Sequence, residues 1–253
     1  GSTWTTPTAA ENGLLTDDDG WHTAPVPVVT HGERVWRAFE FAPSEHRSTW
    51  RPLVLSAPAH SDLLRRSNWT FSEQYAHDPS DALEYIEGNV VVSPDGNLVD
   101  IVRVNSGKSH EPPVVDKAML LHVGDDGVSL GHQRPRDVID FPGGGSKFTI
   151  RYDEKSGRYL SLVNGQSEPN VWRNVLYLAS STDLRSWTID RELLRHPAAD
   201  THAFQYVDWT FDGTDIIYVS RTAFDDRMGG AHNAHDANFI TFHRLERFRD
   251  YIG

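Results

Sequence analysis

One pattern recurs four times along this chain of 253 residues. A run of β-branched and aromatic residues meets a glycine-containing turn, a second such run follows, and a third comes after it. The four hairpins lie at 26–41, 88–105, 147–164 and 204–224, and the third runs lie at 51–58, 117–124, 174–181 and 238–245. Helical periodicity is nearly absent, so the chain is predicted to be all-β.

The spacing of the copies, roughly 55 to 65 residues, is typical of four-stranded blades arranged around an axis. We therefore predict a β-propeller that occupies residues 1–253 as a single domain. Its blades are expected at about 20–76, 85–135, 146–196 and 202–250. A β-sandwich is the alternative, because the number of strands alone does not separate the two folds.

Two stretches share a serine, an Asp-Leu pair and a tryptophan that opens the last strand of a blade: SAPAHSDLLRRSNWTF and SSTDLRSWTI. This pattern resembles the S-x-D-L-x-x-W signature of carbohydrate-active propellers of the arabinanase and fructosidase type, a relative of the Asp-box of sialidases. We expect Asp62 and Asp183 to accept backbone N–H groups in their turns, and Trp69 and Trp187 to pack between blades. The motif thus indicates a fold and not a catalytic site.

The first residues, GSTWTTPT, place Trp4 at the tryptophan position of such a motif. Residues 1–19 are therefore interpreted as the remnant of an additional blade or as a strand that closes the fourth blade. We favour the first interpretation, which predicts a five-bladed propeller with an incomplete N-terminal blade. The second predicts a closed four-bladed ring.

Charge and composition exclude several classes of function. A formal net charge of −12 disfavours nucleic acid and anionic membranes as partners. No run approaches 18 consecutive apolar residues, so no membrane insertion is expected. The absence of cysteine excludes disulfides and thiolate sites, and it suits a secreted or periplasmic protein. The glycine run at 143–145 precedes no helical pattern, so no cofactor is expected.

In each predicted blade, the first strand begins on the face where the second strand ends and the third begins. Residues at these three places are expected to surround the mouth of the axis. The first strands bring polar or titratable residues to this face: His22, Glu87, Lys147, Gln205, Tyr206 and Asp208. Solvated strand ends are the alternative explanation for each of them.

Arginines stand near the ends of three second strands, at Arg37, Arg103 and Arg221. Their side chains are expected on one side of their strands, because side chains alternate with a period of two. Clustered guanidinium groups repel one another unless an anion lies among them, and their planar shape suits a carboxylate. We therefore predict that the three arginines bind a carboxylate of the substrate. Pairing of each arginine with a nearby acid, Glu40, Asp100 or Asp225, is the alternative.

The third strands add Arg173, His235, Asp236 and Asn238 to the same face. The stretch HNAHDANFITFH, residues 232–243, is interpreted as a polar loop that enters a strand, in which His235 and Asp236 orient a catalytic imidazole or a substrate hydroxyl. Its histidines are not spaced as zinc ligands on one element, and no spaced acidic motif suggests calcium. No metal site is therefore expected.

Glycoside hydrolysis usually requires two carboxyl groups, and Glu87 and Asp208 are the predicted pair because they begin inner strands of different blades. Tyr206 is placed on the same side as Asp208, and a tyrosine replaces the carboxylate nucleophile in sialidases. His22, His235 and Asp236 are expected to support these groups. Lys147, Gln205, Arg173 and Asn238 are expected to join the arginines in binding the substrate.

The phrases KFTIRYD, HAFQYVDWTFDG, DIIYVSRTA and HDANFITFHR resemble bacterial exo-sialidase-like proteins of the sialidase or BNR-like propeller superfamily. The resemblance covers roughly residues 20–250 and implies an exo-acting glycosidase on a terminal acidic sugar, of the uronic or sialic type. The chain departs from true sialidases because it lacks an Arg-Ile-Pro motif, a complete Asp-box and six blades.

Three other functions fit the same residues. A polysaccharide lyase would abstract the proton next to a uronate carboxylate with a histidine or tyrosine while arginine neutralises the carboxylate. A neutral-sugar furanosidase would need three acids at the axis. A carbohydrate-binding propeller without catalysis would use Trp21, Trp36, Trp172 and Trp209 as stacking platforms.

Overall fold

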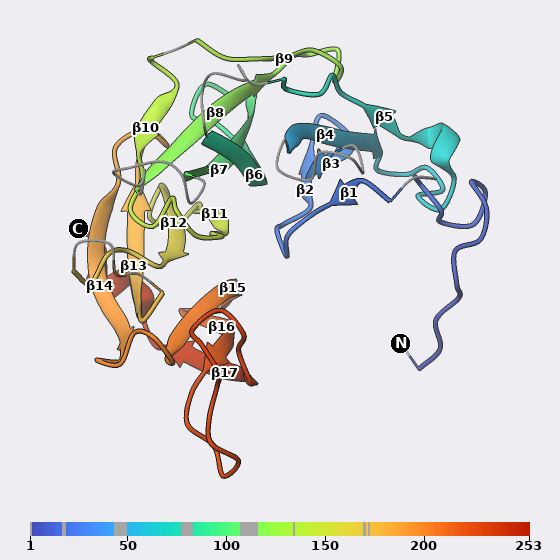
Figure 1. The fold of residues 1–253 in the computed structure, drawn as a ribbon. Helices are drawn as coiled ribbons and strands as arrows, with labels where there is room; N and C mark the ends of the chain where they lie inside the picture. Colours follow the sequence, from blue (N-terminus) through green and yellow to red (C-terminus); the bar gives the residue numbers. More distant parts are fainter. Residues whose placement is uncertain are drawn as a thin grey trace.

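The computed structural model describes residues 2–16, 19–42, 50–76, 83–106, 116–133, 135–168, 171 and 173–253. Four antiparallel sheets follow one another around a centre, so the protein is a β-propeller of four blades (Figure 1). This confirms the predicted β-propeller and matches the four-bladed alternative, whereas the favoured five-bladed form is not found among the described residues. No helix in the described part of the chain is long and apolar enough to cross a membrane.

The strands coincide with the predicted runs. Blade 1 consists of β1 (Trp21–His22), β2 (Val29–His31), β3 (Arg34–Phe41), β4 (Arg51–Pro58) and β5 (Thr70–Phe71). Blade 2 consists of β6 (Leu83–Val92), β7 (Leu98–Ser106), β8 (Lys117–Val123), β9 (Leu130–Gly131) and β10 (Val138–Asp140). Strands β9 and β10 both pair with β8, so blade 2 continues past the stretch assigned to it from the sequence.

Blade 3 consists of β11 (Ile150–Asp153), β12 (Arg158–Val163), β13 (Val175–Ser181) and β14 (Thr188–Arg195). Blade 4 consists of β15 (Ala203–Asp212), β16 (Asp215–Ala223) and β17 (Phe239–Leu245). Two short 3₁₀ helices, η1 (Arg66–Asn68) and η2 (Phe248–Tyr251), follow blade elements. Every blade places its first strand innermost, and this order fixes which strand ends share a face.

Residues 2–16 contain no strand, and Trp4 is exposed. This segment contacts the turn after β4 through backbone hydrogen bonds from Gly13 N to Leu64 O and from Arg66 N to Ala10 O, both 2.7 Å long. Within the described part of the segment, it therefore adds neither a blade nor a closing strand.

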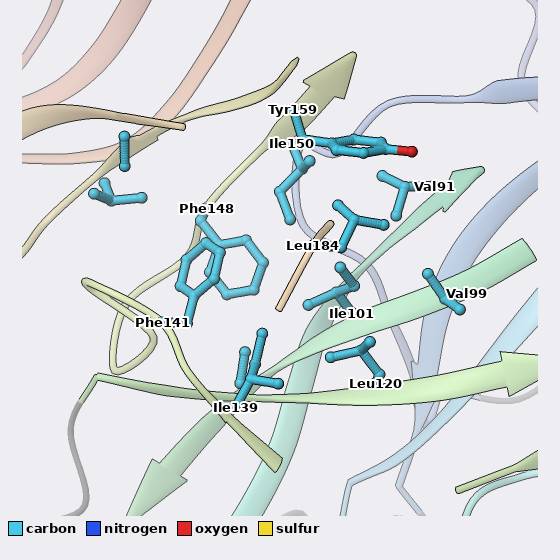
Figure 2. Packing of buried hydrophobic residues seen from close by; sticks show 13 residues of the cluster. Val91, Val99, Ile101, Leu120, Ile139, Phe141, Phe148, Ile150, Tyr159 and Leu184 are labelled. Atoms are coloured by element: carbon cyan, nitrogen blue, oxygen red, sulfur yellow. The ribbon is translucent and has the colours of Figure 1, made fainter. Parts of the chain in front are cut away.

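Hydrophobic clusters join successive blades. The cluster between blades 2 and 3 includes Ile101 and Leu120 from one side and Phe148, Ile150 and Tyr159 from the other (Figure 2). Similar clusters join blade 1 to blade 2 and blade 3 to blade 4. Burial of large apolar side chains in these layers is the main stabilising contribution, since a fully buried Leu or Phe contributes about 1.5–3 kcal/mol. The core therefore lies between the blades.

The turn motif of blade 3 behaves as predicted. Asp183 Oδ1 accepts the backbone N–H groups of Arg185 at 2.8 Å and Ser186 at 2.7 Å. Trp187 packs against the cluster between blades 2 and 3, with its ring centroid 4.8 Å from that of Phe141. In blade 1, Asp62 accepts one backbone N–H, whereas Trp69 is in none of the clusters found among the described residues.

Replacing Asp183 with alanine is expected to lower the free energy of unfolding by about 1–2 kcal/mol, because the two backbone N–H groups lose their acceptor. The midpoint of urea unfolding measures the effect. Asp183→Asn keeps an acceptor oxygen and should lose less than half as much. Equal losses in the two variants would show that the turn does not depend on these hydrogen bonds.

Candidate active site

Two inner strands share one irregularity on the predicted face. The register of β6 shifts between Ile86 and Asn89, and that of β15 shifts between Gln205 and Asp208. Glu87 and Tyr206 stand at equivalent positions in these bulges, with left-handed φ angles of 59° and 52°. Left-handed backbone is uncommon for residues other than glycine, and such residues cluster at functional sites.

The bulges bring Glu87 and Tyr206 together from different blades. The Tyr206 phenol lies close enough to the Glu87 carboxylate for that charge to act on it. Burial and the nearby Glu87 charge raise the pKa of the Tyr206 phenol. Arg103 donates to Glu87 Oε2 at 2.7 Å, and the Arg221 guanidinium lies over the Tyr206 ring, 4.3 Å from its centroid. Each bulge residue thus has an arginine from the neighbouring second strand as its partner.

A third arginine approaches from the loop before β13. Arg173 has a φ of 80°, and its guanidinium donates to Gln205 Oε1. Burial and the charges of Arg103 and Arg221 lower the pKa of Arg173, while Tyr206 and Glu87 oppose this effect. The amide nitrogen of Gln205 donates to the carbonyl oxygens of Ala234 and His235. Arg103, Arg173 and Arg221 therefore form one cluster, which we call the arginine cluster.

The structure does not bring Arg37 into this cluster. Arg37 lies in the middle of β3 opposite Leu55, whereas Arg103 and Arg221 pair with the residues that precede the bulges. The Arg37 guanidinium donates to Ala24 O at 3.2 Å. Burial lowers its pKa, and the charges of Asp208 and Glu40 oppose that effect. The sequence pattern placed Arg37 near the end of its strand, and so too close to the face on which the arginine cluster lies.

Asp208 does not pair with Glu87 in the way that Tyr206 does. Arg151 Nη2 lies 3.5 Å from Asp208 Oδ1, and both residues line a shallow groove on blade 4. The expectation that Tyr206 and Asp208 share a side assumed regular alternation. The bulge breaks that alternation, because Tyr206 and Val207 have no partners in the ladder. Glu87 therefore meets Tyr206, the residue equivalent to it.

His22 lies at the start of blade 1 and hydrogen-bonds Glu40 through Nδ1. The Glu40 side chain is only 1% exposed, whereas His22 is 40% exposed. The hydrogen bond raises the pKa of His22, and burial raises that of Glu40. The charge of Glu87 acts on both His22 and Glu40, so this pair lies near the first bulge. The sequence indicates Glu40 only as a partner for an arginine. Alternation along β3 is the signal that could have predicted its burial, because Glu40 shares its side of the strand with the buried Trp36 and Ala38.

Lys147 is buried, with 2% of its surface exposed. Its ammonium group donates to Thr149 Oγ1 and to Val207 O, each at 2.6 Å. Burial lowers its pKa to about 7, and the charges of Asp208 and Glu87 oppose this effect. A side chain this buried does not reach a ligand at the surface, so substrate binding by Lys147 is not supported.

The histidine-rich stretch forms a polar loop before β17, in agreement with its interpretation from the sequence. His235 and Asp236 hydrogen-bond each other at 3.0 Å, and both side chains are exposed. The backbone oxygen of His235 accepts from Arg221 at 2.8 Å, so its carbonyl and not its imidazole contacts the arginine cluster. Asn238 ties the loop to Phe224 and Asp226 and lies apart from the cluster. No group of metal-ligating side chains occurs in the described ranges.

The tryptophans proposed as sugar-stacking platforms mostly pack inside the protein. Trp36 and Trp209 are buried in clusters between blades. Trp21 packs against Phe41 and Phe71 within blade 1. Trp172 lies outside the described residues. These positions leave little support for a lectin-like site built on these tryptophans.

A cavity of about 530 Å³ opens at the other end of the axis. It is lined by the hairpin ends of the inner strands, including Val29, Val92, Tyr152 and Phe211, and its walls are mostly apolar. It contains neither Glu87 nor Tyr206. We place the candidate site at the opposite end, where the arginines, the tyrosine and the carboxylates meet.

Gly88 is a close-packed position beside Glu87. A Cβ there would overlap the Asp100 carboxyl, which is fully buried. Neither oxygen of this carboxyl has a hydrogen-bond partner among the described residues. Burial, with a smaller effect of the Glu40 charge, raises the pKa of Asp100 well above its usual value. The first bulge therefore has a glycine where it rests against Asp100.

Gly88→Ala is expected to lower the free energy of unfolding by about 1–3 kcal/mol, because the added methyl overpacks a buried site. Thermal and urea unfolding measure the loss. Gly131→Ala is the matched control, since nothing lies within 4 Å of a Cβ at that strand position. In a double-mutant cycle, Asp100→Ala should remove part of the loss. Strictly additive effects would contradict the proposed clash.

No family model matches this chain. No curated protein matches it either. Similar folds occur among solved structures. A β-fructofuranosidase from Schwanniomyces occidentalis complexed with fructosyl-erythritol superposes with a TM-score of 0.58 at 13% identity, covering 94% of this chain and 51% of that one.

An exo-β-1,3-galactanase from Phanerochaete chrysosporium has a TM-score of 0.57 at 8% identity and covers 84% of this chain and 46% of its own. A GH32 β-fructofuranosidase from Bombyx mori has a TM-score of 0.53 at 15% identity, with coverages of 85% and 46%. This chain spans about half the length of these structures. At such identities the likeness shows the fold alone. The chain thus has the propeller fold found in these glycosidases, and the resemblance to sialidases stays a prediction.

Proposed function

We propose that the protein is a glycoside hydrolase that removes a terminal acidic sugar. The observation that supports this proposal best is the meeting of Glu87 and Tyr206 beneath three arginines. The glycosidases with a similar fold are consistent with hydrolysis of glycans, although their printed substrates are fructosides and galactans. The acidic specificity rests on the arginine cluster.

The arginine cluster suits a carboxylate on the substrate. Arg103 is neutralised by Glu87, while Arg173 and Arg221 are held by uncharged oxygens of Gln205 and His235. Two of the three positive charges therefore lack an acidic partner in direct contact within the described residues. A bound carboxylate would supply that missing charge, and each charge-assisted hydrogen bond contributes about 1.5–3 kcal/mol.

Tyr206 and Glu87 are assigned to the nucleophilic step. The raised pKa keeps the phenol protonated, so it needs a base in order to react. Tyr206 Oη attacks the anomeric carbon while Glu87 takes its proton, and the bond to the leaving oxygen breaks. Water then attacks the same carbon, the bond from that carbon to Tyr206 Oη breaks, and Glu87 returns the proton to Tyr206 Oη. Arg103 holds the Glu87 carboxylate in place for both transfers.

His22 is assigned as the proton donor to the leaving oxygen. Its hydrogen bond to Glu40 raises its pKa, so more of the imidazole is protonated near neutral pH than in a free histidine. Its partly exposed side chain lies beside Trp50 in a tilted arrangement, with 5.3 Å between the ring centroids. After the leaving group departs, the neutral imidazole accepts a proton from the attacking water.

The arrangement also suits a second reaction. A tyrosine beside an arginine cluster would serve a lyase, in which the phenol removes the proton next to a uronate carboxylate that arginine neutralises. The two reactions differ in their products. Hydrolysis releases a saturated sugar, whereas elimination leaves an unsaturated uronate that absorbs near-ultraviolet light.

Umbelliferyl glycosides of glucuronic acid and N-acetylneuraminic acid, their neutral counterparts, and uronate oligosaccharides test the proposal. We expect turnover of at least one acidic substrate, release of a saturated sugar and no turnover of the neutral glycosides. Arg173→Met should raise KM about 10–100-fold, equivalent to the loss of one charged hydrogen bond. Arg195→Met, an exposed arginine on β14, is the control and should leave KM unchanged. Selective turnover of neutral glycosides would contradict the acidic specificity.

A further inference from the structure

The Tyr206 bulge rests on a buried group that the proposed reaction does not use. Lys147 lies just before β11 in blade 3, and its ammonium group donates to the carbonyl oxygen of Val207 at 2.6 Å. Val207 is the second residue of the bulge in β15. Thr149 Oγ1 lies 3.3 Å from the same oxygen and accepts from Lys147 at 2.6 Å. Blade 3 thus holds the backbone of blade 4 directly behind Tyr206.

This support replaces hydrogen bonds that the bulge removes. Tyr206 and Val207 have no partners in the β15–β16 ladder, so the sheet does not fix their backbone. A left-handed residue other than glycine costs roughly 1–3 kcal/mol and persists only where its surroundings hold it. The buried ammonium group of Lys147 contacts this part of the bulge through the carbonyl oxygen of Val207.

The Glu87 bulge also has a buried ionisable side chain of the preceding blade beside it. The Glu40 carboxyl of blade 1 is buried and lies close enough to Glu87 in blade 2 for the two charges to interact. In the Tyr206 bulge, the hydrogen bond from Lys147 restrains the angle at which the bulge side chain leaves the strand.

We propose that Lys147 is a positioning residue, which fixes the left-handed backbone at Tyr206 through Val207 and so directs the phenol toward the Glu87 carboxylate. The catalytic meaning of this restraint rests on the proposed function. The restraint itself is a property of the fold and can be measured without a substrate.

The charge on Lys147 links this restraint to pH. Burial lowers its pKa to about 7. The charged groups that face it are Asp208 on β15 and Glu87 on β6, which favour the ammonium form, and Arg151 on β11, which disfavours it. An ammonium group donates a stronger hydrogen bond to Val207 O than a neutral amine does. The environment of Tyr206 should therefore change as Lys147 loses its proton.

Nuclear magnetic resonance tests the restraint in the intact chain. The chain has four lysines, Lys108, Lys117, Lys147 and Lys155, and eight tyrosines, so ¹³C-labelled lysine and fluorotyrosine give few signals. Lys147→Met and Tyr206→Phe assign the two resonances. We expect the Tyr206 fluorine signal to shift with pH at the same midpoint as the Lys147 carbon signal. A Tyr206 fluorine signal that stays constant while Lys147 titrates would overturn the proposal. This measurement is made on the wild-type protein, so it does not depend on the folding of a variant.

The same shift should vanish in Lys147→Met and persist in Lys155→Met, the matched exposed lysine. Persistence of the shift in Lys147→Met would count against the proposal. Because no substrate is added, these outcomes do not depend on whether the protein hydrolyses acidic sugars.

Kinetics and chemical rescue provide the second test. Lys147→Met should lower kcat about 10–100-fold, because a misplaced reacting group loses much of its orientation, and KM should stay within about threefold, because the arginine cluster is intact. The chain has no cysteine, so K147C can be alkylated selectively in denaturant and refolded. Aminoethylation should restore most of kcat, whereas an uncharged propyl adduct should not. Equal kcat values for the two adducts would overturn the positioning role.

Discussion

Tyr206→Phe is expected to lower kcat about 10²–10⁴-fold on the acidic substrate, because the variant removes the oxygen that attacks the anomeric carbon. The phenyl ring still fills the space beneath Arg221, so KM should change by less than about threefold. Steady-state kinetics separate the two effects. A KM increase with unchanged kcat would instead assign Tyr206 to binding.

Two comparisons make this prediction specific. Glu87→Gln should lower kcat by a similar factor, and the double variant should be no slower than the slower single variant, because the two groups act as a unit. Tyr152→Phe is the control, since Tyr152 is an exposed tyrosine on β11 at the other end of the axis. If the kcat loss of the double variant equalled the product of the two single losses, Glu87 and Tyr206 would act independently.

Lys147→Met is expected to change how stability depends on pH. The folded-state pKa of Lys147, about 7, lies below its ordinary value of 10.5. The unfolded state therefore binds more protons between these two values, and the free energy of unfolding of the wild type rises with pH across that window. Below pH 7 the full penalty applies, on the order of 5 kcal/mol for a pKa of about 7 in place of 10.5.

Urea unfolding of both proteins from pH 6 to pH 10 measures this dependence. The difference between the two curves isolates Lys147, because other groups titrate in both proteins. Relative to Lys147→Met, the wild type should gain stability as pH rises through and above about 7. Lys155→Met should follow the wild type. Parallel curves for wild type and Lys147→Met would show that the buried lysine titrates as it does in water.

Much of the fold could be predicted because it is encoded locally. A glycine turn between two β-branched runs specifies a hairpin whichever way the blade packs, and four copies specify four sheets. The direction of each strand follows from the hairpin, so the face that gathers Glu87, Tyr206 and Arg173 could also be predicted. The Asp183 turn depends on residues two and three positions away, so the role of Asp183 could also be predicted from the sequence.

The pairing within the site could not be predicted in the same way. Alternation along a strand placed Tyr206 with Asp208 and added Arg37 to the arginines, but a bulge shifts the register and the alternation fails there. The residues next to Tyr206 in the sequence do not specify that bulge, because its backbone is held by Lys147 from another blade. Glu40 was missed for a related reason, since its partners His22 and Glu87 come from two different strands.

The sequence by itself thus determined an all-β propeller, the order of its strands and the end of the axis at which polar residues collect, because turns and strand directions are local properties. The tertiary structure alone decided that Glu87 faces Tyr206, that Arg173 replaces Arg37 in the arginine cluster, and that Lys147 and Glu40 lie behind the bulges. These are contacts between blades, and packing between blades sets them through side chains that are distant in the chain.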